Sequence, residues 1–146
     1  MKKVEKSKKR ILSWNIDNHS FGVNVEYCFE VQKGRNVVEV PYSKNYITGI
    51  VNLRGDIVTV IDLFVLMGQR ETPDMSKQVI VRLKQGDRQV AILADSVSEV
   101  IEISEEKLES SEAHLSENEL KYIPNIARIG NKLILILEVS ELFEVH

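Results

Sequence analysis

Cysteine occurs once in this chain of 146 residues, at position 28. A single cysteine excludes an intrachain disulfide and any metal site built from several thiolates. It is compatible with a reducing cytoplasm, where disulfides are rare. The three histidines, at positions 19, 114 and 146, do not have the spacing of metal ligands. We therefore predict no metal and no cofactor.

Long apolar runs are also missing. The longest purely aliphatic run covers residues 133–137, far short of the roughly 18 residues that indicate a membrane span. No apolar stretch follows the basic start of the chain, so it does not read as a secretory signal. The formal net charge of −3 gives no overall argument for nucleic-acid binding. We expect no direct membrane insertion and no nucleic-acid partner.

Motifs of catalysis are absent from the sequence. It contains no glycine-rich phosphate loop, no Gly-x-Ser-x-Gly nucleophile turn and no zinc signature. The carboxylates at expected strand edges have no partner acid or base nearby in the sequence. We predict no catalytic residue and no enzymatic activity.

The stretch from 46 to 68 is the most informative part of the chain. Residues 47–53 and 57–61 are aliphatic runs of strand length, and Gly55-Asp56 between them fits a tight turn, with Asp bonding its own backbone. Asp62 is placed to cap one helical turn over 63–67, which Gly68 ends. This pattern puts Arg54 at a hairpin tip, where it suits binding of a carboxylate.

The chain contains two copies of one β-rich unit. A shift of 76 positions aligns residues 122–126 with 46–50 and residues 133–137 with 57–61, and a shift of 69 aligns residues 91–95 with 22–26. Two copies indicate a duplication, because stacked repeat arrays usually need three or more. The second copy has Ile129-Gly130-Asn131-Lys132 where the first has Leu53-Arg54-Gly55-Asp56, so its hairpin lacks the arginine.

About ten short strands separated by turn signals predict an all-β architecture of small barrels or sandwiches. We expect residues 1–10, with six basic side chains, to form a flexible basic tail; a polybasic arm for acidic lipid or RNA is the alternative. Residues 69–77 are expected to join the two copies. The acidic stretch 104–121 is expected to be mostly loop, because Leu108, Leu115 and Leu120 do not form a sustained helical stripe. Ser104 could cap a helical turn there, but Lys107 stands where a capping box needs an acid or Gln.

Several of these residues together resemble the CheW family, the coupling proteins that join chemoreceptors to the histidine kinase CheA. The resemblance is carried by Phe21-Gly22-Val23-x-Val25, Glu30-Val31, the run from Ile47 through Gly49-Ile50-Val51-Asn52-Leu53-Arg54-Gly55 to Ile57, and Ile61-Asp62-Leu63. It covers nearly the whole chain, from Ile11 to Phe143. Thr59, Ala91, Asn125 and Glu138 depart from the common family residues, which leaves open whether the pathway is chemotaxis or another chemosensory output.

The resemblance implies two small five-stranded SH3-like β-barrel subdomains around a shared hydrophobic core, within a single domain over 11–146. The first barrel would cover about 20–76, and the second about 77–146 plus the N-terminal strand 11–17. It implies a non-enzymatic adaptor, cytoplasmic and recruited to membrane-associated receptor arrays. Its partners would be the regulatory domain of a CheA-type histidine kinase and the cytoplasmic tip of a methyl-accepting chemoreceptor, the latter in a groove between the subdomains.

Carried over by position, the resemblance makes Arg54, Glu30 and Cys28 candidates for the receptor or kinase interface. Ile92, Val97 and Val100 would line the second subdomain's side of the groove, although packing in the core is the stronger reading for these aliphatic residues. A further set is expected to shape the hairpin and its surroundings: Gly49, Asn52, Gly55 and Asp62. A small-barrel nucleic-acid binder is the alternative from another class. A CheV-like fusion is disfavoured, because no residues are left for a receiver domain.

Overall fold

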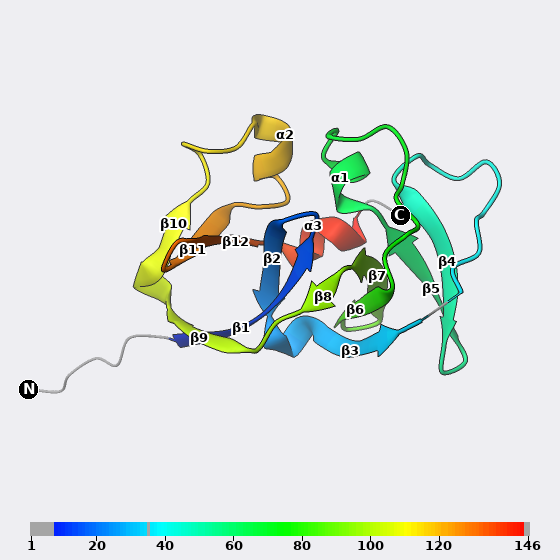
Figure 1. Cartoon of the computed structure of the whole chain (residues 1–146), viewed down its shortest axis with the longest axis horizontal. Helices are drawn as coiled ribbons and strands as arrows, with labels where there is room; N and C mark the ends of the chain where they lie inside the picture. Colours follow the sequence, from blue (N-terminus) through cyan, green and yellow to red (C-terminus); the bar gives the residue numbers. More distant parts are fainter. Residues whose placement is uncertain (1–7, 35, 145–146) are drawn as a thin grey trace, which may run out of the picture.

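The computed structural model describes residues 8–34 and 36–144, which form two β-sheets side by side, with short helices along one edge and between the sheets (Figure 1). Half of the chain is in strands, so the predicted all-β class is confirmed. None of the described helices has the length and apolar character needed to cross a membrane. The helices and 3₁₀ turns are α1 (Leu63–Leu66), α2 (Glu117–Leu120), α3 (Val139–Phe143), η1 (Val25–Tyr27) and η2 (Glu105–Lys107).

The five-stranded sheet has the spatial order β3-β6-β7-β5-β4. All its neighbours are antiparallel except β5 and β7, which run parallel. Its strands are β3 (Cys28–Lys33), β4 (Ile47–Leu53), β5 (Asp56–Ile61), β6 (Val79–Gln85) and β7 (Arg88–Ala94).

The seven-stranded sheet has the order β10-β11-β12-β2-β1-β8, with β9 also paired to β1. Here too one neighbouring pair, β12 and β2, is parallel. Its strands are β1 (Lys8–Ile16), β2 (His19–Asn24), β8 (Ser96–Val97), β9 (Ile101–Ser104), β10 (Leu108–Ser110), β11 (Asn125–Ile129) and β12 (Lys132–Ile136).

The duplication read from the sequence recurs in the strand registers. Val60 pairs with Ala91 in the five-stranded sheet, and Ile136 pairs with Gly22 in the seven-stranded sheet. The shifts of 76 and 69 positions convert one pair into the other. The backbone hydrogen bonds from Asp62 to Tyr46 and from Glu138 to Tyr122, both 2.8 Å, are related in the same way. The two copies therefore have the same local fold.

The predicted division into barrels at 20–76 and 77–146 is wrong, because the two copies interleave. β2 belongs to the seven-stranded sheet, while β6 and β7 complete the five-stranded one. Each copy gives its first hairpin to one sheet and its later strands to the other. The similarity between the copies cannot reveal this exchange. The first hairpins of the two copies, β1–β2 and β6–β7, are alike, so either one could pair with the later strands of either copy. The first strand does lie with the later strands of the chain, as expected. Residues 69–77 do join the two copies, but the strands on either side of this segment, β5 and β6, both belong to the five-stranded sheet.

The prediction of a flexible basic tail is wrong for residues 8–10. Residues 8–10 are part of β1 and pair with β9, and Lys9 forms an ion pair of 3.5 Å with Glu105. Residues 1–7 of the expected tail lie outside the described part of the chain. The acidic stretch that follows β8 thus provides a pairing strand for residues 8–10 and a negative charge for Lys9. This pairing joins two segments that are far apart in the chain, so neither segment by itself predicts it.

The acidic stretch 104–121 is not mostly loop, because it contains η2, β10 and α2. A capping box does begin a helix there, but at Ser116, twelve residues beyond Ser104. The Ser116 side chain accepts from the backbone N–H of Glu119, and the Glu119 carboxylate accepts from the backbone N–H of Ser116. These reciprocal hydrogen bonds stabilise a helical turn that is too short to show an apolar stripe.

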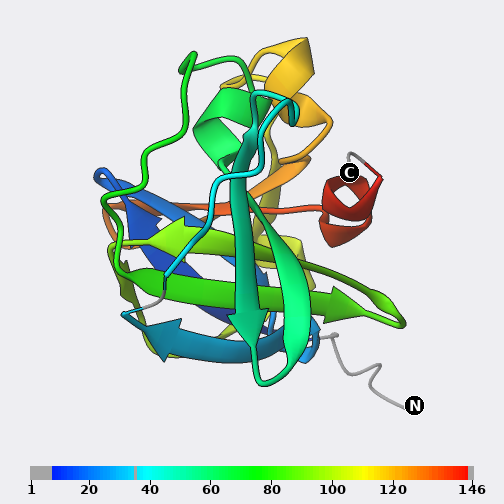
Figure 2. The ribbon, with the colours of Figure 1, turned by 90° about the vertical axis from the view of Figure 1, so that its right-hand side faces the viewer.

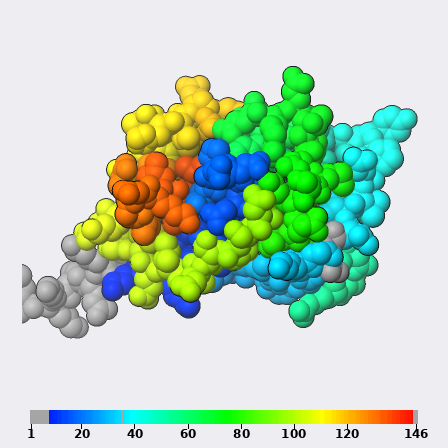
Figure 3. Space-filling model, viewed as in Figure 1, coloured from blue at the N-terminus to red at the C-terminus, as the bar shows by residue number. Residues whose placement is uncertain are grey.

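The shared core lies between the sheets and draws on the first hairpin of each copy. Trp14 and Phe21 enter it from β1 and β2, Val81 and Ile92 from β6 and β7, and Leu142 from α3. A smaller apolar cluster fills the inside of each sheet's own barrel. In the space-filling view the blue β1–β2 turn lies between the orange β11–β12 hairpin and the green residues of the other sheet (Figure 3). Burial of these hairpins against each other holds the subdomains together.

A network of ion pairs also links the two sheets. Lys77 pairs with Asp17 at 2.6 Å and with Asp95 at 2.9 Å, and Arg70 pairs with Asp17 and Asp62 at 3.2 Å. Asp17 lies in the β1–β2 turn, whereas Asp62 follows β5, so the network joins the two sheets. The hydrogen bond from Lys77 lowers the pKa of the Asp95 carboxyl below its ordinary value. The lysine thereby fixes the segment that leads into β6.

Candidate protein-interaction site

Arg54 lies at the tip of the β4–β5 hairpin, which projects away from α1 (Figure 2). Arg54 and Gly55 form the two-residue turn with φ values of 54° and 91°. Positive φ at both central residues is characteristic of the type I′ hairpin turn. The Asn52 side chain accepts a hydrogen bond from the Gly55 N–H at 2.9 Å, so both residues shape the turn. The Arg54 side chain is 78% exposed and therefore accessible to a partner.

Glu30, on β3, forms an ion pair with the Arg54 side chain. Its Oε2 lies 3.2 Å from Arg54 Nε, and its Oε1 accepts a hydrogen bond from Arg82 Nη1 at 2.6 Å. Burial raises the pKa of the Glu30 carboxyl, but hydrogen bonds from Gln32 and Arg82 and the charges of both arginines outweigh burial, so this pKa lies below its ordinary value. Glu30 is thus an ionised carboxylate shared by two guanidinium groups.

Arg82 is the buried centre of the cluster, with 1% of its surface exposed. Besides Glu30, its guanidinium donates to Asp56 Oδ2 at 2.6 Å and to Gln89 Oε1 at 2.7 Å. Asp56 was expected to bond its own backbone in the turn; instead it starts β5 and accepts from Arg82. A buried charge needs such partners, because desolvation without them is very costly.

The charged cluster borders an exposed apolar side chain. The Phe29 ring is about half exposed and lies 4.6 Å from the Arg82 guanidinium carbon and 4.8 Å from Lys84 Nζ. We call Phe29, Glu30, Arg54 and Lys84 the Arg54 surface. An exposed aromatic ring beside an accessible arginine is the combination that dominates many protein–protein interfaces.

Two residues predicted to shape the motif do so by packing and capping. A Cβ at Gly49 would clash with the backbone oxygen of Val38, so only glycine lets the 37–40 segment approach β4 this closely. The Asp62 carboxylate accepts hydrogen bonds from the backbone N–H groups of Phe64 and Val65 at 2.9 and 3.1 Å. It therefore caps α1, as predicted, and Gly68 follows the C-cap at φ 79°.

The other interface candidates lie in different surroundings. Cys28 is half-buried on β3, and burial raises the pKa of its thiol. Ile92 is 1% exposed inside the shared core, so it does not line a surface groove, in keeping with its core reading. Val97 is half-buried on β8, opposite Trp14, and Val100 just beyond is 39% exposed. Both valines belong to the seven-stranded side, away from the sheet that carries Arg54 and Glu30.

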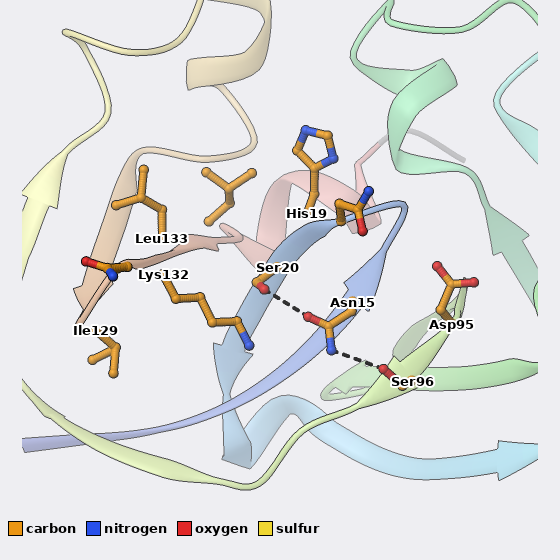
Figure 4. Close-up of a pocket in the computed structure, with 11 residues that line it drawn as sticks. Asn15, His19, Ser20, Asp95, Ser96, Ile129, Lys132 and Leu133 are labelled. Carbon is orange, nitrogen blue, oxygen red and sulfur yellow. Dashed lines mark hydrogen bonds between the residues drawn. The ribbon is translucent and has the colours of Figure 1, made fainter.

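Two surface hollows are lined by residues other than Ile92, Val97 and Val100, which were expected to line the groove. One of about 1010 Å³ lies between the β1–β2 turn, Asp95-Ser96 and the β11–β12 hairpin (Figure 4). Asn15 forms its floor, accepting from Ser20 at 2.9 Å and donating to Ser96 at 3.1 Å. A second hollow, of about 240 Å³, has an apolar floor and lies where α1 approaches α2. Among the described residues no three metal-ligating side chains form a group that could hold an ion.

The sequence reading missed Arg82, the centre of the cluster. Its strand reads Val-Ile-Val-Arg-Leu-Lys-Gln, in which an arginine interrupts a run of apolar residues. The strand's alternation places Arg82 on the same face as Ile80, a core residue. A charge on an inward face requires buried partners, so this pattern was an available signal.

Comparisons with known proteins agree on one family. The family model described as CheW-like domain matches residues 10–146. A chemotaxis protein CheW of Thermotoga maritima is 27% identical, over 92% of this chain and 87% of its own length. A probable chemotaxis protein CheW of Rhizobium etli is 24% identical over 98% and 92%. The crystal structure of the scaffolding protein TtCheW from Thermoanaerobacter tengcongensis superposes with a TM-score of 0.80 at 27% identity, covering 96% of this chain and 95% of that one.

Proposed function

This chain belongs to the CheW-like domain family, and we propose that it is a non-enzymatic scaffold that couples chemoreceptor tips to a CheA-type histidine kinase in chemotaxis signalling. The names of its relatives support a scaffold in chemotaxis. The proposed partners are the regulatory domain of the kinase and the cytoplasmic tip of a methyl-accepting chemoreceptor. The proposed location is the cytoplasm, with recruitment to membrane-associated receptor arrays.

The observation that carries this proposal is the display of Arg54. Its side chain is exposed at the hairpin tip and, among the described residues, forms one ion pair, to Glu30. A carboxylate of a partner can bind such a group with two parallel hydrogen bonds, while Glu30 keeps Arg82 as its other partner. The adjoining Phe29 offers apolar area to the same partner. The Arg54 surface thus has the composition of a binding hot spot.

Co-sedimentation with receptor-bearing membranes and CheA from the same genome tests the proposal. The wild-type chain is expected to sediment with both partners together, and Arg54→Glu to be lost from the pellet. Arg128→Glu is the matched control, because Arg128 is also an exposed arginine, with an ion pair of 3.3 Å to Glu109 on the other sheet. Failure of the wild-type chain to bind either partner contradicts the proposal. Equal losses with both variants would assign the effect to net charge alone.

The two alternative functions suggested by the sequence differ in how well they are supported. A divergent chemosensory pathway would use the same surface, and genes for a kinase or receptors beside this one would decide between the pathways. A nucleic-acid binder depended on the basic tail, of which residues 8–10 are paired with β9. Salt-dependent binding to RNA would be needed to support that reading.

A further inference from the structure

The buried guanidinium of Arg82 forms hydrogen bonds with the residues that surround Arg54. Arg82 extends from β6 and donates to Glu30, to Asp56 and, at 3.5 Å, to the backbone oxygen of Leu53. Leu53 directly precedes Arg54, and Asp56 directly follows Gly55. Arg82 therefore contacts both ends of the Arg54 turn, and it also contacts the carboxylate to which Arg54 binds.

The balance of charge makes the position of Arg54 depend on Arg82. Glu30 Oε1 is taken by Arg82, and Oε2 accepts from Gln32 at 2.8 Å and faces Arg54. Asp56 has its own bond to Arg82. Without Arg82, two neighbouring carboxylates would lack a buried cation, and Arg54 is the adjacent guanidinium able to move inward to them. Such a movement would remove Arg54 from the surface.

The seven-stranded sheet supplies an internal comparison for the five-stranded one. Under the shift of 69, Ser13 of β1 occupies the place of Arg82, as their pairings with Gly22 and Ala91 show. Under the shift of 76, Gly130 occupies the place of Arg54. Ser13 is buried, so the equivalent position closes without an arginine. Both positions without an arginine, Ser13 and Gly130, belong to the seven-stranded sheet, and both arginines belong to the five-stranded sheet, which links Arg82 to Arg54 and not to the general requirements of such a sheet.

We propose that Arg82 is a positioning residue for Arg54. The Arg82 guanidinium holds the Glu30 and Asp56 carboxylates in place, so that the Arg54 guanidinium stays exposed on the surface, where it can face a partner. The inference rests on the proposed function of Arg54 in partner binding. Arg82 itself lies beneath Phe29 and is too buried to contact a partner directly.

NMR of the Arg54 Nε–Hε group in the full chain tests the position directly. The variants are Arg82→Met, which removes the charge, and Arg82→Lys, which keeps the charge but not the two-pronged fork. Arg88→Met is the control, because Arg88 is an arginine of the neighbouring strand β7 whose guanidinium pairs with Glu144 at 2.6 Å. We expect a changed chemical shift and a changed heteronuclear NOE for Arg54 in both Arg82 variants, and neither change in the control.

The same proteins are then titrated with the purified CheA regulatory domain. We expect the affinity to fall about tenfold for Arg82→Lys, as for the loss of one well-placed charge-assisted hydrogen bond, and to stay unchanged for the control. If the Arg54 signals match wild type in folded Arg82→Lys, Arg82 is only structural and the inference is overturned, whether or not Arg82→Met folds. If the wild-type chain does not bind the kinase domain, the proposed function fails, while the NMR comparison still decides the position of Arg54.

Discussion

Glu30 and Arg82 are joined by a hydrogen bond of 2.6 Å although they lie 52 positions apart in the chain. The bond connects β3 to β6, and its carboxylate reaches on to the exposed Arg54. An interior charge thus supports a surface charge through one shared residue. Arg54 pairs with Glu30 and has a positive φ of 54°, an unfavourable backbone conformation for a residue with a Cβ that is a common mark of functional residues.

Replacing Arg54 by glycine should separate binding from stability. Glycine adopts the positive φ of this turn freely, whereas a residue with a Cβ pays about 1 kcal/mol there. The lost ion pair is exposed on the arginine side and contributes at most about 1 kcal/mol. These effects offset each other, so urea unfolding of Arg54→Gly should give a free energy of unfolding within about 1 kcal/mol of wild type. Kinase binding should be lost; a loss of several kcal/mol in stability would instead mean that Arg54 mainly holds the fold.

Ile92 and Val100 should respond very differently to truncation. Ile92→Ala opens a cavity in the shared core and should lower the free energy of unfolding by about 2–5 kcal/mol. Val100→Ala removes a partly exposed side chain and should cost no more than about 0.5 kcal/mol. Chemical denaturation of both variants measures the difference. Similar small costs would contradict the burial of Ile92 in the core.

Gly49→Ala should destabilise the hairpin by overpacking. The new methyl group would meet the Val38 backbone oxygen, and separating β4 from this segment should cost about 1–3 kcal/mol. Gly86→Ala is the control, because that glycine has φ 61° but nothing within 4 Å of the added Cβ. It should cost only the backbone strain, about 1 kcal/mol. Thermal unfolding of both proteins compares them, and an equal loss would show that the contact with Val38 is unimportant.

Acid should weaken the junction between the sheets. Hydrogen bonds, from Lys77 to Asp95 and from Ser76 to Asp74, lower the pKa of both carboxyls below their ordinary value of 3.8. A carboxyl with a lowered pKa in the folded state contributes stability that is present above its unfolded pKa and is lost as the pH falls through its folded pKa. The free energy of unfolding in urea should therefore decline steadily as the pH falls below about 4.

Lys77→Met provides the matched comparison for this acid effect. The variant removes the cation that Asp17, Asp74 and Asp95 share, so it should be less stable than wild type at pH 7. It should also lose less stability between pH 7 and pH 3, because Asp95 no longer gains from the hydrogen bond. Parallel pH profiles for the two proteins would show that the network does not link proton binding to folding.

Local and periodic features of the fold could be read from the sequence alone. The 47–61 hairpin, the Asp62 cap, the all-β class and the duplication depend on neighbouring residues or on fixed spacings, and the structure contains each of them. The tip position of Arg54 follows from the same local pattern. The hairpin, the Asp62 cap and the Arg54 tip are encoded within residues 46–68, where turn and capping chemistry act directly.

Only the tertiary structure decided which strands share a sheet and what surrounds Arg54. The exchange of hairpins between the copies, the pairing of residues 8–10 with β9 and the burial of Arg82 all join segments that are far apart in the chain. Such contacts depend on which apolar faces bury each other and on which charges can share the remaining polar space. Neither is specified by local sequence pattern, and so the partners of Arg82, and with them its connection to Arg54, could be identified only once β3 and β6 lay side by side.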